Sequence, residues 1–252
     1  FVAQTPESFQ YDSDGNLTQD GRFTYTWDGE NRLIGVTTRD DLPTAVPRVM
    51  VEYAYDHQSR RIASATAVWT NGSWQAVESR AFLYDGWNVV KEAINHQPST
   101  TNYYTWGLDL SGSLQGAGGI GGLLAAVLDG TIALYTYDAN GNVGQLVCTD
   151  GTLAAAYEYS PFGETIVSTG PLSKTNPFRF STKHWDDLTR LGYWGYRYYH
   201  PDMGRWLSRD PVEESHGANI YVYVWNNAAN GLDYLGQFPI GGLPVILPCG
   251  SL

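Results

Sequence analysis

The residue types that most often bind metals or attack substrates are few in this sequence, and they stand apart. None of the cysteines or histidines has a partner at the spacing of a metal site, and the histidines are expected at surface or turn positions. These residues are Cys148, Cys249, His57, His96, His184, His200 and His216. The glycine-rich stretch from Gly116 to Gly122 lacks the Lys and the Ser or Thr of a phosphate-binding loop. The sequence therefore predicts no metal, cofactor or nucleotide.

The composition indicates an all-β protein. Aromatic residues make up 14% of the 252 residues, there are 28 glycines, and charged residues are only 16%, a mixture typical of twisted strands joined by tight turns. The net charge of −11 repels phosphate backbones, so a nucleic-acid partner is not expected. The longest apolar run, residues 118–128, is too short to cross a bilayer and is expected to be a buried loop or plug. No membrane span is predicted.

A short phrase recurs along the chain: an aromatic residue, then Asp, a step rich in Gly and Asn, a polar residue and an apolar residue. It occurs at residues 11–17 (YDSDGNL), 27–33 (WDGENRL) and 137–143 (YDANGNV), with looser copies at 55–62 and 84–89. Asp can accept hydrogen bonds from backbone N–H groups a few residues on, and Gly and Asn tolerate positive φ. The spacing is irregular, which indicates hairpins of different length around a shared turn.

Between the phrases, the chain alternates in the manner of strands. In residues 22–27 the aromatics at 23, 25 and 27 share one face, and the polar residues share the other. Residues 68–77 predict a hairpin whose tight turn is supplied by Asn71-Gly72. The expected architecture is an antiparallel ribbon of stacked β-hairpins in which each hairpin covers the edges of its neighbours.

The recurring phrase resembles the YD repeat of Rhs proteins, and the resemblance extends from Tyr11 to about Gly236. In that family the ribbon of hairpins curls into a hollow shell around a toxin or other C-terminal cargo. The resemblance therefore implies a bacterial protein that is secreted or displayed at the cell surface. Its partners would be the rest of its own polypeptide, namely further YD repeats and a C-terminal cargo. The start at Phe1, without Met or a signal peptide, suggests a piece of a longer protein.

From Tyr157 the pattern changes, and the following stretch resembles the Rhs repeat-associated core domain. The resemblance rests on the run YWGYRYYHPDMGRWL at 193–207, the Arg-Asp-Pro step after it, and an alternating run at 219–227 that predicts a strand. The sequence thus divides into YD-repeat ribbon (1–156), core or plug segment (157–237) and a short apolar tail rich in Pro and Gly (238–252).

In many bacterial members the core is an intramolecular aspartyl protease that separates cargo from shell. The resemblance assigns the catalytic carboxylates to Asp210 and Asp233, with Arg209 holding the ionised partner. It places the cut between Gln237 and Phe238. The chain is thus predicted to be, at most, an intramolecular aspartyl autoprotease.

The chemistry of such a pair is simple. Two carboxylates that are brought together cannot both ionise cheaply, so one keeps a proton as the acid while the other activates water. The alternative is that both aspartates only hold turns. The sequence departs from the family pattern at Tyr234, which replaces Pro, at Gln237, which replaces Leu, and at Ala228, which replaces Pro.

Two other functions remain open at this stage. Exposed Trp and Tyr rings could stack on sugars, which would make the chain a non-catalytic adhesion or carbohydrate-binding module at a cell surface. Alternatively, the chain could be a structural filament or surface-layer piece. Rings that face one another within the sheet would argue against sugar binding.

Overall fold

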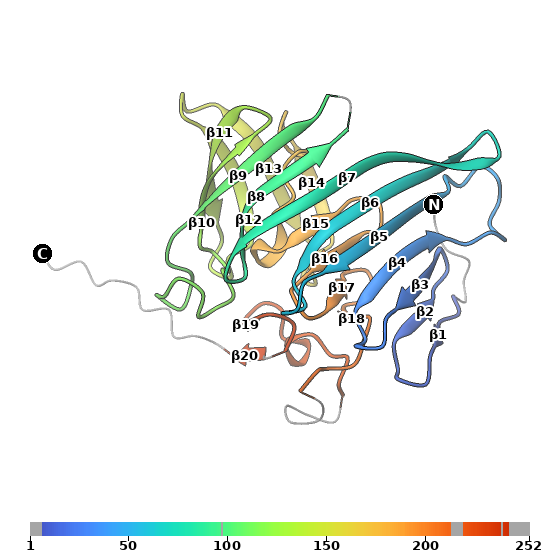
Figure 1. Ribbon diagram of the computed structural model, residues 1–252. Helices are drawn as coiled ribbons and strands as arrows, with labels where there is room; N and C mark the ends of the chain where they lie inside the picture. The colour runs from blue at the N-terminus through green and yellow to red at the C-terminus, as the bar shows by residue number, and fades with distance from the viewer. Residues whose placement is uncertain (1–6, 97, 213–218, 238, 242–252) are drawn as a thin grey trace, which may run out of the picture.

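The computed structural model describes residues 7–96, 98–212, 219–237 and 239–241. A single 14-stranded antiparallel sheet dominates it, and each strand pairs with the next one in the chain. Figure 1 shows this sheet curving around the segment that follows it. The all-β ribbon predicted from the sequence is confirmed.

The strands of the sheet are β1 (Gln10–Tyr11), β2 (Leu17–Gln19), β3 (Phe23–Trp27), β4 (Leu33–Thr38), β5 (Val49–Tyr55), β6 (Arg61–Thr70), β7 (Ser73–Asp85), β8 (Asn88–Asn95), β9 (Thr100–Trp106), β10 (Leu123–Leu128), β11 (Thr131–Tyr137), β12 (Val143–Cys148), β13 (Leu153–Tyr159) and β14 (Thr165–Thr169). The predicted hairpin at 68–77 is the β6–β7 turn, where Thr70 pairs with Ser73. Asn71 and Gly72 both have positive φ there, at 51° and 80°, which suits a two-residue hairpin turn.

The recurring phrase forms the same turn in three of its copies, those led by Trp27, Tyr55 and Tyr137. In the copy between β11 and β12, Asp138 Oδ1 accepts hydrogen bonds of 2.9 Å from the backbone N–H groups of Asn140 and Asn142. Gly141 occupies the left-handed region at φ 71°. Asp28 and Asp56 accept the equivalent pairs of backbone hydrogen bonds. In these three copies the Asp therefore fixes the register at one end of a hairpin.

Aromatic residues at or next to the ends of strands, four of which lead a copy of the phrase, tie their hairpins to earlier strands. The Tyr159 hydroxyl, for example, donates a 2.9 Å hydrogen bond to the backbone carbonyl of Val143. The same contact recurs along the sheet, from Trp27 to Leu17, Tyr55 to Leu33, Tyr84 to Arg61, Trp106 to Val89 and Tyr137 to Leu123. These rings bury apolar surface and satisfy a carbonyl at the same time, which explains why Tyr and Trp occupy these positions.

The chain after β14, here called the inner segment (residues 170–212 and 219–237), packs against the inner face of the sheet. Its elements are η1 (Phe180–Thr182), β15 (His184–Asp186), β16 (Leu191–Tyr193), β17 (Tyr198–His200), β18 (Arg205–Trp206), η3 (Val224–Asn226) and β19 (Gly231–Asp233), the last of which pairs with β20 (Pro239–Gly241). Side chains of this segment join the apolar clusters of both halves of the sheet. Because β13 and β14 still belong to the sheet, the sheet runs past residue 156 and the architecture changes after Thr169.

The strand predicted at residues 219–227 is wrong. Val224, Trp225 and Asn226 have φ values of 40°, 53° and 60°, which no strand contains. Adjacent Tyr223 and Val224 are both fully buried, so the chain here is covered on two sides and the alternation of side chains does not mark a half-exposed strand. Within the described part of the chain, no helix has the length and hydropathy to cross a membrane.

Candidate functional site

Asp210 and Asp233 meet on one guanidinium group. Arg197 Nη2 lies 2.8 Å from Asp210 Oδ2 and 3.6 Å from Asp233 Oδ2. Because both oxygens contact the same nitrogen, their separation cannot exceed the sum of these two distances. The exposed fraction of the three side chains is 2% for Arg197, 9% for Asp210 and 1% for Asp233. Two carboxylates that are distant in the sequence therefore share one buried cation.

Arg197 lies in the turn between β16 and β17, and its remaining contacts fix its orientation. Its guanidinium carbon lies 4.3 Å from the centre of the Trp206 ring. Its Nη1 donates to the carbonyl of Ile220, and its Nε donates to the carbonyl of Gly236. The planar group thus has an aromatic ring against its face and acceptors at its edges, an arrangement that suits Arg better than Lys.

Burial controls the electrostatics of the site. Burial raises the pKa of the Asp233 carboxyl above its usual value, although Arg197 and two backbone N–H groups act in the opposite direction. Burial likewise lowers the pKa of the Arg197 guanidinium, against the attraction of Asp233 and Asp210. Asp233 is therefore the carboxyl group whose environment favours retention of a proton.

Residues 231–237, here called the strap, take their shape partly from Asp233. Its Oδ1 accepts hydrogen bonds from the backbone N–H groups of Gly236 at 2.6 Å and Gln237 at 3.0 Å. Gly236 has φ 78°, so the chain turns sharply there. Asp210 Oδ1 accepts a 3.0 Å hydrogen bond from Val212 N–H. Both aspartates thus hold turns, and the same two carboxyl groups face Arg197.

Arg209, which the sequence analysis assigns to the site, lies elsewhere. Its side chain is exposed and packs against the turn at Gly15. In the described part of the chain, the ion pairs of Asp210 and Asp233 go to Arg197. Gln237 is half-buried at the end of the strap, and Phe238 lies outside the described residues.

Two buried cations of this region, Arg197 and Lys183, were not predicted from the sequence. Lys183 Nζ donates to the carbonyls of Gly118 at 2.8 Å and Tyr234 at 3.1 Å. Burial lowers the pKa of the Lys183 amine to about 8, against the charges of Asp233 and Asp109. A charge inside an aromatic run, as in Tyr196-Arg197-Tyr198, is the signal that could have revealed Arg197, because such a charge is buried only when it is paired.

A second buried polar cluster joins the inner segment to the sheet. Glu92 is fully buried and lies 2.8 Å from Arg80 Nη1 and 3.5 Å from His184 Nε2. His184 Nδ1 lies 2.9 Å from Arg61 Nη2. The surface position predicted for His184 is therefore wrong: it is 8% exposed, because its ring fills the space between strands of the sheet and β15.

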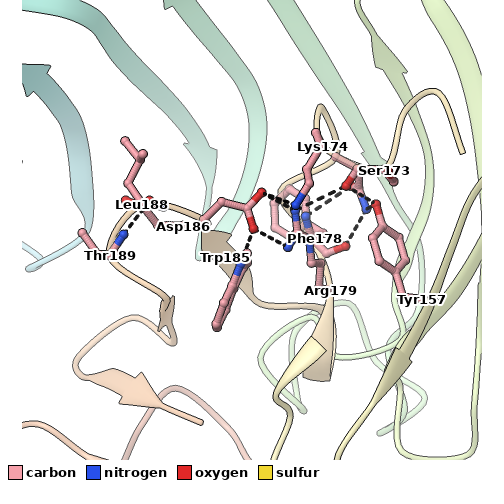
Figure 2. A network of polar contacts seen from close by, with 11 residues as sticks. Tyr157, Ser173, Lys174, Phe178, Arg179, Trp185, Asp186, Leu188 and Thr189 are labelled. Atoms are coloured by element: carbon pink, nitrogen blue, oxygen red, sulfur yellow. Dashed lines mark hydrogen bonds and ion pairs between the residues drawn. The ribbon is translucent and has the colours of Figure 1, made fainter. Parts of the chain in front are cut away.

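A third network fixes the start of the inner segment to β13. Arg179 Nη1 and Nη2 lie 2.8 and 2.9 Å from the two carboxylate oxygens of Asp187. Lys174 Nζ lies 3.5 Å from the same carboxylate, and Trp185 Nε1 donates to it. Figure 2 shows how these groups converge beside Ser173, whose carbonyl accepts hydrogen bonds from Arg179 and from the Tyr157 hydroxyl. The charges are paired within the chain, so this network anchors the inner segment.

Among the residues that the structure describes, no three His, Cys, Asp or Glu side chains form a group that could hold a metal. Carboxyl groups placed as those of Asp210 and Asp233 are can take part in acid–base chemistry.

No protein-family model matches the chain. It is 33% identical over 240 residues to the tRNA3(Ser)-specific nuclease WapA of Bacillus spizizenii, a match that covers 92% of this chain and 9% of that protein. It is 30% identical over 237 residues to double-stranded DNA deaminase toxin A of Burkholderia cenocepacia, covering 86% of this chain and 16% of the toxin. The chain thus spans only a small part of these relatives.

Among solved structures, the fold is similar to a chain of the Photorhabdus luminescens Tc holotoxin pore. The TM-score is 0.72 at 21% identity, and the match covers 91% of this chain and 11% of that one. The likeness to this structure shows the fold, and the two relatives show that the sequence is similar to a segment of WapA and of the deaminase toxin.

Proposed function

We propose that this chain is a wall segment and closing core of the protein shell of a secreted bacterial Rhs-type toxin. The sheet supplies the wall, and the inner segment, which covers its inner face, corresponds to the Rhs repeat-associated core. The similarity to WapA and to the deaminase toxin supports a role within a longer toxin polypeptide. Its partners would then be further repeats and a cargo of the same polypeptide.

We further propose that the core cuts its own chain between Gln237 and Phe238. In this mechanism Asp210, ionised on Arg197, takes a proton from water while the water oxygen attacks the Gln237 carbonyl carbon. Asp233, whose burial favours the protonated form, donates its proton to the carbonyl oxygen. When the C–N bond breaks, protonated Asp210 gives its proton to the leaving Phe238 nitrogen, and a hydroxyl of the tetrahedral intermediate returns a proton to Asp233 as the new carboxyl group of Gln237 forms.

One observation carries this proposal: Asp233 lies in the shared Arg197 site and also bonds to the backbone of Gln237. The 3.0 Å hydrogen bond from Gln237 N–H to Asp233 Oδ1 keeps the carboxyl group within one residue of the proposed cut. Since Oδ1 already accepts two N–H groups, Oδ2 is the oxygen that would carry the proton. Holding the reacting groups this close supplies much of the rate enhancement of an intramolecular reaction.

Mass spectrometry of the purified chain tests self-cleavage. We expect a product that ends at Gln237, and we expect Asp210→Asn and Asp233→Asn each to leave the chain intact. Asp150→Asn is the matched control, because exposed Asp150 also holds a turn, through Thr152 N–H, but lies far from the site in sequence and fold. Circular dichroism shows whether each variant is folded. An intact wild-type chain, or equal cleavage in Asp210→Asn, would reject the proposal.

Glycan binding is a second candidate, supported by one pair of residues. The rings of Trp69 and Trp74 meet edge to face at the end of the β6–β7 hairpin, with centres 5.4 Å apart; this contact covers part of the rings, but Trp69 remains 40% exposed. Exposed Trp rings can stack on sugars. A glycan array should then lose its signal with Trp69→Ala, whereas an array without binding by the wild type would dismiss this candidate.

A further inference from the structure

The loop between β9 and β10 is folded around one buried carboxylate. Asp109 Oδ2 accepts hydrogen bonds from the backbone N–H groups of Ala117 at 2.6 Å and Gly119 at 3.1 Å. Asp109 is 5% exposed, and Ala117 and Ile120 are fully buried. The glycine-rich run 116–122, which carries no phosphate-binding signature, is therefore an ordered part of the loop between β9 and β10.

This loop contacts the strap directly. Gly118 has φ 64°, and a Cβ at this position would lie 1.9 Å from the carbonyl oxygen of Tyr234. Lys183 Nζ bridges the two segments, since it donates to the carbonyls of both Gly118 and Tyr234. Leu232 of β19 packs against Ala117 and Ile120. Figure 1 shows the loop beside β19 and β20 at the lower end of the sheet.

We propose that the loop 116–122 and Lys183 form a clamp on the Tyr234 peptide that holds the strap in its cleavable geometry and makes self-cleavage depend on a completed sheet. This inference rests on the self-cleavage proposed above, and it adds that the clamp determines when self-cleavage can occur. Tyr234 follows Asp233 directly. A shift of its peptide therefore moves the Asp233 carboxyl group relative to Gln237.

The clamp couples two parts of the chain that are remote in sequence. Gly118 belongs to a loop held at both ends by strands from the middle of the sheet, β9 and β10. The loop can reach Tyr234 only when these strands have paired and the inner segment has docked. Lys183 adds the same requirement, because it reaches both carbonyls only when η1 and β15 are in place. Cleavage before the wall is built would thereby be prevented, and cargo would remain attached to an unfinished shell.

Two glycine substitutions in the loop between β9 and β10 distinguish the effect of contact with the strap from the effect of backbone strain within the loop. Gly118→Ala places a methyl group against the Tyr234 carbonyl, whereas Gly112→Ala has a similar φ of 76° and no atom within 4 Å of its new Cβ. We expect Gly118→Ala to slow cleavage at least about tenfold, as expected when reacting groups are displaced by about 1 Å. Gly112→Ala should cleave at the wild-type rate.

Lys183→Met provides a second test by removing the bridge without adding bulk to the loop. Hydrogen–deuterium exchange of the strap peptide 231–237 gives a readout that needs no cleavage when it is measured in the Asp210→Asn background. We expect faster exchange of this peptide in Gly118→Ala and Lys183→Met, and no change in Gly112→Ala. Circular dichroism and exchange in β3–β5 show whether the sheet itself remains folded.

The outcomes distinguish this inference from the proposed self-cleavage. If the wild type is not cleaved but both clamp variants loosen the strap, the clamp stands as a structural device and self-cleavage fails. If the wild type is cleaved and folded Gly118→Ala and Lys183→Met are cleaved equally fast, the clamp is overturned while self-cleavage stands. Should Gly118→Ala fail to fold, unchanged cleavage and exchange in Lys183→Met would overturn it.

Discussion

Arg197 and Asp210 form a 2.8 Å ion pair that is almost completely removed from solvent, and Asp233 shares the same guanidinium nitrogen. A buried pair of this kind adds little net stability compared with an apolar replacement of both partners. Removing one partner is costly, because the other charge remains buried and uncompensated. Here the loss of Arg197 would leave two carboxylates together in the same enclosed space.

Arg197→Met should therefore destabilise the folded chain strongly. We expect the free energy of unfolding to fall by about 3–5 kcal/mol, measured by urea unfolding at neutral pH. Self-cleavage should also be lost, since neither carboxylate would be held in place. Arg209→Met is the matched control: its exposed side chain makes no described ion pair with either aspartate, so stability should change by less than about 0.5 kcal/mol. Equal effects of the two variants would contradict the assignment of Arg197.

The pH dependence of self-cleavage should follow the proton on Asp233. Burial raises the pKa of this carboxyl group, and the proposed mechanism uses its protonated form. The rate should therefore fall as the pH rises through the Asp233 pKa, in the manner of a general acid. Single-turnover cleavage measured by mass spectrometry over a pH series that begins at the ordinary Asp value of about 4 and extends upward tests this. A rate that increases steadily with pH would exclude Asp233 as the acid.

Stability should decrease in mild acid because of His184. Burial lowers the pKa of its imidazole from 6.5 to about 4, Arg61 acts in the same direction, and Glu92 opposes both. Between these two pH values the unfolded chain binds a proton that the folded chain does not, so stability is lost as pH falls from 6.5 toward 4. Despite its burial, the pKa of Glu92 is lowered by its contacts with His184 and Arg80.

Urea unfolding at neutral pH and at about pH 5 measures this loss. Since the pKa of His200 is also lowered, the contribution of His184 is the difference between the wild type and His184→Gln. We expect the variant to lose less stability on acidification. A pH dependence identical to that of the wild type would show that His184 does not titrate as described.

The wall of the fold could be predicted because its determinants are local. Asp138 fixes its own turn through N–H groups two and four residues away, and Asn71-Gly72 supplies the conformation that its hairpin needs. The inner segment is different. Its strands are short, its residues are covered on more than one side, and η3 departs from the strand that its alternation indicates.

The candidate site was predictable only in part for the same reason. Both aspartates follow from their motif, but the cation between them does not, because Arg197 reaches Asp210 and Asp233 only in the folded chain. Lys183 likewise contacts Gly118 and Tyr234, which are distant from it in sequence. Long-range pairing of buried charges leaves no period or spacing in a sequence.

The hydrogen bonds that tyrosine hydroxyls donate between hairpins can be tested by removing one hydroxyl group. Tyr159→Phe removes the hydroxyl that donates to the Val143 carbonyl and leaves that carbonyl without this partner. We expect a loss of about 1 kcal/mol in the free energy of unfolding, measured by urea unfolding. Tyr103→Phe is the control, because the Tyr103 ring is 50% exposed on the sheet and water can replace any contact of its hydroxyl. If the two variants were equally stable, the rings would act through apolar burial alone, and the recurring hydrogen bond would not explain the choice of Tyr at these positions.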